Sequence, residues 1–396
     1  MKRAVTALLS LLALLVLGIV IVAFAVPSDR LMTMLEQRLK STSKENGVAI
    51  SILDGSQLTL FPTIQFDSSL VTIETPAKED TVARRTALEG ITVTTNWWQL
   101  ATNPRFSIAV DRATFDPLNP SGATTGLDAI ISRLEFTAFR VVVVPTADDL
   151  SMPILEARLL GGQLQSQLTI GSGTDESKIS SSGVIDEALA SEVLAVLGSS
   201  IIPSGFVDLA WDIEGIQADA TLEPPEIFGE ATLEGSDLGL SQINLELELC
   251  NAYNRASGRP TARSASTSTP IRSLSAIYNL DGYRVDITDL ELAIPGLVVT
   301  GVTTIDRTNQ NFDAKLQAVV GEDFGEQIPN CKIDQRLRAI EWPIRCRGNL
   351  IEDDLRSWCS VELESLLRRG LESELKRRLN DGGVESLLRS LIPRST

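Results

Sequence analysis

The chain has 396 residues and a formal net charge of −17, with 35 Lys and Arg against 52 Asp and Glu. So acidic a balance argues against nucleic acid as a partner, because phosphate binding needs clustered Lys and Arg. The sequence contains no histidine, which excludes Ser-His-Asp and Cys-His catalysis, HExxH metalloproteases and His-containing zinc sites. Apolar residues make up 43% and charged residues 22%, and this composition excludes wholesale disorder.

The first 27 residues predict a membrane segment. Lys2 and Arg3 precede an uncharged run of 23 residues, Ala4–Val26, which is long enough to cross roughly 30 Å of hydrocarbon as a helix. We expect a retained single-pass anchor, and the alternative is a signal peptide cleaved near Ala23-Phe24-Ala25. The acidic bulk and the four cysteines favour an oxidising compartment for the rest of the chain. We therefore expect a bacterial inner-membrane protein with most of its chain in the periplasm.

Short strands with one apolar face are predicted along most of the chain. Ile50 and Ile52 begin a period-2 pattern that recurs up to Ile170 and again from Leu274 to Ala318. Leu245, Leu247 and Leu249 fit a further strand. The dipeptides Asp54-Gly55, Asp281-Gly282 and Pro295-Gly296 are typical of tight turns. Strict alternation gives a sheet one apolar and one polar face.

Few helices are predicted beside these strands. They are an amphipathic helix after Ser28, a helix over Glu187–Leu197 with Asp186 as its cap, and C-terminal amphipathic helices over Leu363–Leu379 and Val384–Leu391. The expected fold is mainly β with a few helices: an elongated antiparallel sheet or groove of repeated hairpins, with an N-terminal transmembrane helix. Its apolar face must be covered, either because the sheet folds into a sandwich or barrel or because the face encloses a ligand.

Several segments resemble the AsmA family. Towards the N-terminus they are Ile52-Leu53-Asp54-Gly55, Leu60-Phe61-Pro62 and Trp97-Trp98-Gln99-Leu100. Towards the C-terminus they are Asp289-Leu290-Glu291-Leu292, Pro295-Gly296, Val298-Val299-Thr300-Gly301, Ile305-Asp306 and the stretch from Trp342 to Gly348, followed by Cys359. The resemblance covers roughly residues 1–110 and 271–380. It implies a periplasmic, inner-membrane-anchored protein whose repeated β-units form an open, apolar-lined groove. Members are associated with phospholipid transport to the outer membrane and with outer-membrane assembly, and the family is not known for enzymes.

The resemblance and the composition shifts together predict six regions. They are the anchor, 1–27; an N-terminal AsmA-like β-region, 28–150; a middle β-region with one helix, 151–255; a linker rich in Ser, Thr, Arg and Pro, 256–270; a C-terminal AsmA-like β-region, 271–330; and a cysteine-containing segment with a helical tail, 331–396.

Two functions remain open. The first is binding or transfer of phospholipid through an apolar β-groove, in support of outer-membrane lipid homeostasis, because each CH₂ kept out of water is worth roughly 0.8 kcal/mol. The second is a scaffold that regulates outer-membrane protein or envelope assembly without carrying lipid, through a closed core and an exposed edge strand. The candidate groove residues are Leu58, Leu60, Ile64, Phe66, Ile91, Val93, Ile108, Val285, Ile287, Leu292 and Val299. The other interpretation of these residues is a closed, dry core.

No cofactor, metal or enzymatic activity is expected, since the sequence has neither a Gly-rich phosphate loop nor a nucleophile elbow. The expected partners are phospholipids, the bacterial inner membrane and outer-membrane assembly proteins, and not nucleic acid. Cys331, Cys346 and Cys359 are candidates for one disulfide, either Cys346–Cys359 or Cys331–Cys346, while Cys250 stands apart. Sequence alone does not fix the pairing.

Overall fold

The structure is a computed structural model. It describes residues 49–53, 56–75, 83–117, 133–146, 149–172, 176–196, 203–218, 226–241, 244–264, 266–326, 328–331, 333–338, 340–349 and 359–361. The predicted anchor, the helix after Ser28 and the C-terminal amphipathic helices lie outside these residues. Among the residues that are described, no helix has the length and apolar character needed to cross a bilayer.

The chain divides into two compact units. Unit 1 contains residues 1–188, 195–198 and 214–225, and unit 2 contains residues 189–194, 199–213 and 226–396. Both units are built from antiparallel strands, so the chain is mainly β, as predicted, with short helices between some of the strands.

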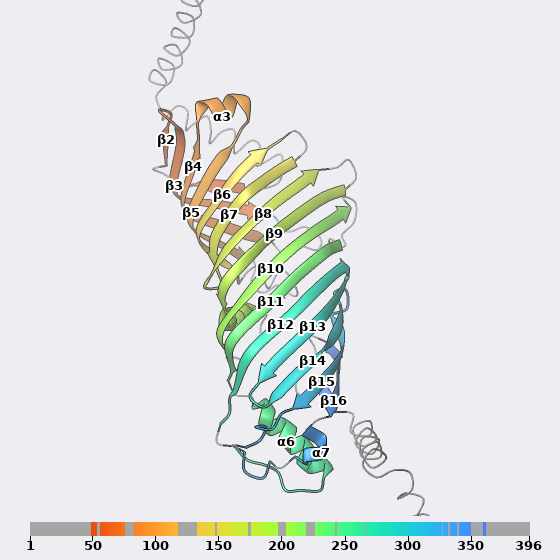
Figure 1. Ribbon diagram of the computed structural model, residues 1–396. Helices are drawn as coiled ribbons and strands as arrows, with labels where there is room; N and C mark the ends of the chain where they lie inside the picture. The colour runs from red at the N-terminus through yellow and green to blue at the C-terminus, as the bar shows by residue number, and fades with distance from the viewer. Residues whose placement is uncertain are drawn as a thin grey trace, which may run out of the picture. The chain divides into compact units, whose positions relative to one another are not determined.

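Unit 1 runs from orange to yellow-green in Figure 1. Its strands are β1 (Ala49–Ile52), β2 (Gln57–Thr59), β3 (Ile64–Thr75), β4 (Arg84–Thr95), β5 (Phe106–Pro117), β6 (Glu135–Pro145), β7 (Asp149–Leu159), β8 (Gly162–Ser172) and β9 (Glu176–Leu189), and α3 (Trp97–Thr102) joins β4 to β5. From β3 to β9 each strand pairs with the next in the chain. Asp54-Gly55, for which a tight turn was predicted, lies outside the described residues, and the strands before and after it, β1 and β2, both pair with β3.

Interruptions of the alternation keep apolar residues on one face of the sheet. Phe136 and Phe139 on β6 are three residues apart, yet both pack against the same core cluster. Between them Ala138 has a left-handed backbone, with φ of 50°, and the pairing with β7 shifts between Thr137 and Arg140. Such a bulge inserts one residue, after which the alternation resumes with the opposite parity. Gly90, with φ of 63°, makes the same change between Leu88 and Ile91 on β4.

Unit 2 holds the green to blue strands of Figure 1. They are β11 (Glu226–Leu240), β12 (Thr269–Gly282), β13 (Arg284–Ile294), β14 (Leu297–Asp306), β15 (Asn311–Val320), β16 (Glu341–Asn349), β17 (Cys359–Val361) and residues 203–213 of β10 (Pro203–Ala218). Neighbouring strands are again antiparallel in chain order from β11 to β17. The turns predicted at Asp281-Gly282 and Pro295-Gly296 are confirmed, since they join β12 to β13 and β13 to β14.

The helix α6 (Leu245–Ala256) stands where the Leu245, Leu247 and Leu249 pattern predicted a strand. That prediction is wrong because Leu245 and Leu249, four residues apart, also lie on one side of a helix, and the buried Cys250 and Tyr253 extend that side. Asn244 decides the outcome as the N-cap, since its Oδ1 accepts a hydrogen bond of 2.8 Å from the Leu247 backbone N–H. The middle region therefore holds more than the one helix expected there.

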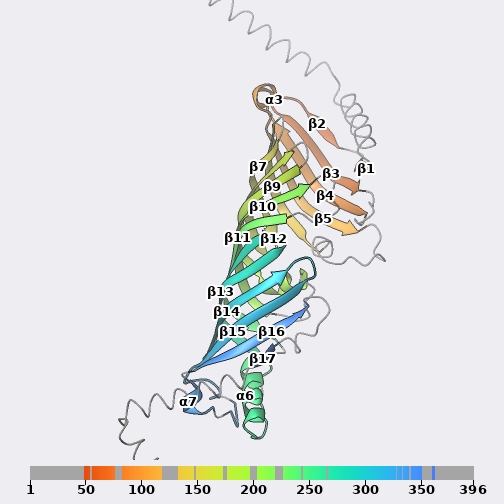
Figure 2. The ribbon, with the colours of Figure 1, turned by 90° about the vertical axis from the view of Figure 1, so that its right-hand side faces the viewer.

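The other helices are short. α5 (Ala190–Val196) is shorter than the helix predicted over Glu187–Leu197, because β9 continues to Leu189. α7 (Gln335–Arg338) lies with α6 at one end of unit 2 (Figures 1 and 2). The described part of the predicted 256–270 linker is not wholly solvated, since Ala262 and Thr269 are buried.

One disulfide joins Cys250 on α6 to Cys331, with 5.5 Å between the two Cα atoms. This bond corrects the sequence-based interpretation twice, because Cys250 is not isolated and the Cys331–Cys346 alternative is wrong. Cys346 is also disulfide-bonded, and it lies opposite Cys359 in the ladder between β16 and β17. The pairing Cys346–Cys359 stays a prediction, and this strand register supports it.

Candidate functional site

A row of apolar side chains crosses six strands of unit 1, from β2 to β7. Each member lies directly opposite the next in the strand pairing, and opposite residues of antiparallel strands share a face. The row runs Leu58, Phe66, Val93, Ile108, Val141 and Leu155. Ile64 lies two residues before Phe66 and Ile91 two before Val93, so both point to the same face. We call this side the apolar face of unit 1.

A second row widens the apolar face of unit 1. Ile52, Val71, Leu88, Ala113, Phe136 and Leu159 oppose one another in the same way. The ring of Phe136 makes edge-to-face contacts with the rings of Phe115 and Phe139, with centroids 5.8 and 6.2 Å apart. The two rows cross the strands at different positions along their length, so the apolar face of unit 1 has width as well as length.

The burial of this face is incomplete. Val71, Ile91, Val110 and Ala113 form a buried cluster. In contrast Phe66, Val93 and Ile108, together with Phe136 and Phe139, are only partly buried against it. Large apolar side chains in a closed core lose nearly all of their exposed surface. The face is therefore shielded largely by its own neighbours within the sheet and still offers apolar surface to an additional molecule.

The opposite side of unit 1 is polar. The Thr92 hydroxyl donates a hydrogen bond of 2.8 Å to Asp67 Oδ1. Ion pairs of 2.7 Å join Arg85 to Glu74 and Arg112 to Glu135. These charged side chains are substantially exposed, so each pair contributes little to stability. Their position nevertheless identifies the side that faces water.

Unit 2 has a corresponding apolar face. One row contains Leu274, Leu292, Val299, Ala318 and Trp342, and others contain Tyr278, Ile287, Thr303 and Ala314, or Leu280, Val285, Ile305 and Phe312. A bulge at Asp289, with φ of 50°, again switches the parity between Ile287 and Leu290. Burial raises the pKa of the Tyr278 phenol above its ordinary value.

The two ends of this second face differ. At one end Trp342, Phe324 and Val320 are fully buried, and the Tyr253 ring of α6 lies 6.0 Å from the Trp342 ring. Glu246 of α6 accepts a hydrogen bond from the Gly325 N–H, and the Cys250–Cys331 disulfide fastens the same helix. We call α6 with residues 321–326 and 328–331 the α6 cap. At the other end Val285, Ile305 and Phe312 are only half-buried.

The sequence-predicted groove residues fall largely on these two faces. Leu58, Ile64, Phe66, Ile91, Val93 and Ile108 lie on the apolar face of unit 1, and Val285, Ile287, Leu292 and Val299 lie on that of unit 2. Leu60 lies outside a strand, where its carbonyl accepts a hydrogen bond of 2.8 Å from Trp97 Nε1. Sequence reasoning left out Val141, Leu155 and Tyr278, although each continues a visible alternation.

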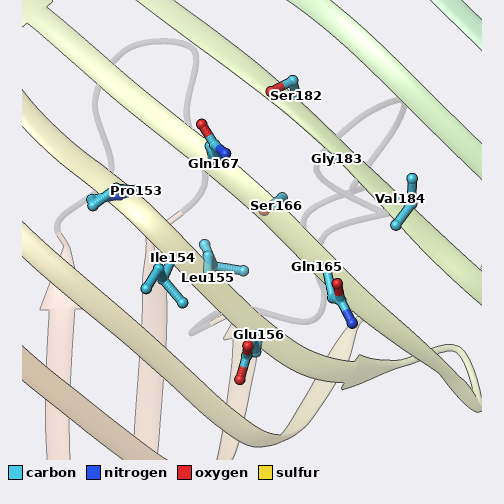
Figure 3. A pocket seen from close by; sticks show the side chains of 10 residues that line it. All are labelled: Pro153, Ile154, Leu155, Glu156, Gln165, Ser166, Gln167, Ser182, Gly183 and Val184. Carbon is cyan, nitrogen blue, oxygen red and sulfur yellow. The ribbon is translucent and has the colours of Figure 1, made fainter.

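A shallow hollow of about 340 Å³ lies over β7, β8 and β9 (Figure 3). Its lining is mixed, with Glu156, Gln165, Gln167 and Ser182 beside Ile154 and Val184. Glu156 is the single carboxylate in this lining, and no Lys, Arg or Cys accompanies it, so the hollow holds no pair of acid and base of the kind that activates a nucleophile. Within the described residues, no three His, Cys, Asp or Glu side chains gather as a metal site would require. The apolar faces are therefore the stronger candidates.

Comparison with known proteins gives one curated relative. The chain is 24% identical to protein AsmA of Escherichia coli strain K12 over 283 residues, which are 70% of this chain and 45% of AsmA. The chain thus matches less than half of that relative's length. No protein-family model matches the chain, and no solved structure matches it significantly. The predicted resemblance is confirmed as a distant homology.

Proposed function

Taking the distant homology to AsmA as the premise, we propose that this protein binds phospholipid acyl chains on its apolar sheet faces and passes lipid within the bacterial envelope. It is a non-enzymatic protein of the inner membrane with most of its chain in the periplasm. The observation that carries the proposal is the row from Leu58 to Leu155, which continues across six strands and whose members, apart from the buried Val141, remain only partly buried.

The dimensions of this row suit an acyl chain. Five strand-to-strand steps of about 4.8 Å make a row about 24 Å long. One bilayer leaflet contributes about 15 Å of hydrocarbon, half of a thickness of roughly 30 Å. Each CH₂ placed against the row instead of water stabilises the complex by roughly 0.8 kcal/mol. The headgroup stays at the edge of the sheet, where water reaches it.

The disulfide between Cys250 and Cys331 supports the proposed compartment. Stable disulfides form in oxidising environments such as the bacterial periplasm and are rare in the cytosol. The uncharged run Ala4–Val26 has the length of a transmembrane helix, which supports the inner-membrane anchor.

The test compares two adjacent substitutions on opposite sides of β5. Ile108 lies on the apolar face, and its exposed neighbour Ser107 lies on the polar side. The full chain is purified in mild detergent, and its phospholipid is measured by native mass spectrometry and by lipid extraction. We expect Ile108→Asp to lose most of the bound phospholipid and Ser107→Asp to keep it, because a carboxylate on the apolar row disfavours hydrocarbon. Both variants retain the same N-terminal segment, so any lipid bound there contributes equally to the phospholipid measured for each.

A second measurement tests the same proposal without the Ile108→Asp variant, in case that variant misfolds. A benzophenone amino acid at position 108 should crosslink to phospholipid in membranes, and the same group at position 107 should not. Equal lipid in both variants together with equal crosslinking would refute the proposal. The scaffold function would then be favoured, since it requires a closed core and no bound lipid.

A further inference from the structure

A cluster of exposed apolar side chains lies at one end of unit 1. The exposed fraction is 76% for Trp98, 51% for Phe61, 43% for Leu100 and 36% for Trp97. These four residues, which we call the α3 tip, come from α3 and from the segment between β2 and β3. Figures 1 and 2 show α3 and β2 at the same end of the unit. Trp342, by contrast, is 1% exposed. Large apolar side chains that gather at the surface in this way mark a contact surface.

The structure holds the α3 tip in a fixed arrangement. Asn96 caps α3, and its side-chain oxygen accepts a hydrogen bond of 2.7 Å from the Gln99 N–H. Trp97 Nε1 donates a hydrogen bond of 2.8 Å to the Leu60 carbonyl, so the helix is tied to the residue that precedes Phe61. These two hydrogen bonds hold α3 in place, so Trp98 is exposed on an ordered helix.

The charge around the α3 tip sets it apart from the rest of the molecule. Residues 56–66 and 93–110 contain the α3 tip and the strand segments next to it, and they include no Asp or Glu, although 52 of the 396 residues are acidic. The single charged side chain in these two segments is the exposed Arg105. An acidic surface would be repelled by anionic lipid headgroups, whereas these two segments carry one cation and aromatic rings.

We propose that the α3 tip inserts into the headgroup region of a phospholipid bilayer. Tryptophan concentrates at membrane interfaces, because its ring is largely apolar while its N–H still finds a polar partner. Arg105 suits the phosphate groups at the same depth. A protein partner would also accept aromatic residues, but the acid-free surroundings favour an anionic lipid surface over the average protein surface. This inference rests on the proposed function, and it names the place where the protein touches its lipid source.

The α3 tip is next to the beginning of the apolar face of unit 1. Thr95, the last residue of β4, lies opposite Ile64, and Trp97 follows two residues later. Leu58 and Phe66 are the next members of the face on this side. An acyl chain that leaves a bilayer at the α3 tip would therefore next meet the apolar side chains of Ile64, Leu58 and Phe66. The 22 residues between Val26 and Ala49 span at most roughly 70–80 Å, so a membrane span at Ala4–Val26 would keep the start of unit 1 within that distance of the bilayer, which allows the α3 tip to reach it.

The experiment measures the depth of Trp98 in the full chain reconstituted into vesicles of phosphatidylcholine and phosphatidylglycerol. Tryptophan emission is recorded with ordinary and with brominated acyl chains, and also with aqueous iodide. The emission that Trp98→Phe removes belongs to Trp98, and Trp211→Phe, on β10, serves as the matched control. We expect brominated lipid to quench the Trp98 emission at least twofold and iodide to reach it poorly. Trp98→Ala should also weaken vesicle binding of a chain lacking residues 1–27 on the order of tenfold, provided that this truncated chain keeps its circular dichroism.

Two outcomes would overturn the inference. Strong quenching by iodide without quenching by brominated lipid would show that Trp98 stays in water. Shielding from both quenchers, with crosslinks between Trp98 positions of two chains, would assign the α3 tip to a second copy of this protein. Either outcome leaves the Ile108 and Ser107 comparison unaffected, so a failure here is distinguishable from a failure of acyl-chain binding.

Discussion

Removal of the Cys250–Cys331 disulfide should cost this protein a large share of its stability. The two cysteines are 81 residues apart, and the closed loop contains β12, β13, β14 and β15. With a loop of that length, the chain-entropy relation gives about 4.5 kcal/mol at 25 °C. We expect the double substitution Cys250→Ala and Cys331→Ala to lower the free energy of unfolding by roughly that amount. Loss of the buried sulfur contacts adds to it.

The assay is urea denaturation of the full chain in detergent. Because the chain has five tryptophans, the signal of Trp342 is the part of the emission that a Trp342→Phe variant lacks. This residue is 1% exposed and contacts Tyr253 of α6, so its emission shifts to the red when the α6 cap leaves the sheet. The control is Ser266→Ala with Ser268→Ala, two exposed residues on the loop that follows α6. We expect this control to change the free energy of unfolding by about 0.5 kcal/mol or less.

A loss below about 1 kcal/mol would refute the reasoning. It would mean that α6 is held on the sheet by packing and hydrogen bonds alone, or that the unfolded chain is already as restricted as the crosslinked one. An unchanged Trp342 transition combined with a destabilised unit 1 would refute it as well, because the crosslink lies entirely within unit 2.

Two further predictions concern the apolar face of unit 2. A Cβ atom on Gly301 would lie 2.5 Å from the Lys315 carbonyl oxygen, so Gly301→Ala should force β14 and β15 apart and lower the free energy of unfolding by about 1–3 kcal/mol. Exposed Val302→Ala is the control, and equal losses in thermal or urea unfolding would contradict this account. Burial raises the pKa of Tyr278, so the stability that its neutral phenol contributes is fully present below the unfolded pKa of about 10 and is lost as the pH rises through the higher folded-state pKa. Tyrosinate absorbance in an alkaline titration should show a late component that Tyr278→Phe removes, and joint titration of all three tyrosines at their ordinary pKa would contradict it.

The strands and their apolar side could be predicted because period-2 alternation is a local property. Val285 and Ile287 lie on one face of β13, and Leu292 lies opposite Val299 across the Pro295-Gly296 turn, as the spacing within each of these pairs indicated. A strand needs only the pattern of its own few residues and a turn at its end. Pairing of each strand with the next in the chain then makes the whole ladder predictable from the order of elements.

Other features depend on information that the local pattern does not carry. Ile287 and Leu290 are three residues apart, and this spacing was the visible signal of a bulge. A prediction based on strict alternation alone does not include bulges. α6 was mistaken for a strand because its leucines fit both periods, and only the Asn244 cap separated them. The partner of Cys331 lies 81 residues away, and nearness in sequence favoured Cys346 wrongly. The size of the apolar faces depends on which opposite residues meet, which a single strand does not reveal.

The bulges at Gly90, Ala138 and Asp289 also give the ladder a unique alignment. In a sheet of strictly alternating strands, sliding one strand by two residues keeps every apolar side chain on the correct side, so misaligned forms differ little in energy. A parity switch part-way along the strand removes this degeneracy. If a strand shifted its register by two residues, the bulges of neighbouring strands would no longer align. The residues between the misaligned bulges would then turn their apolar side chains to water. The interruptions that blur the sequence pattern therefore penalise mispaired folding intermediates in a chain rich in similar strands.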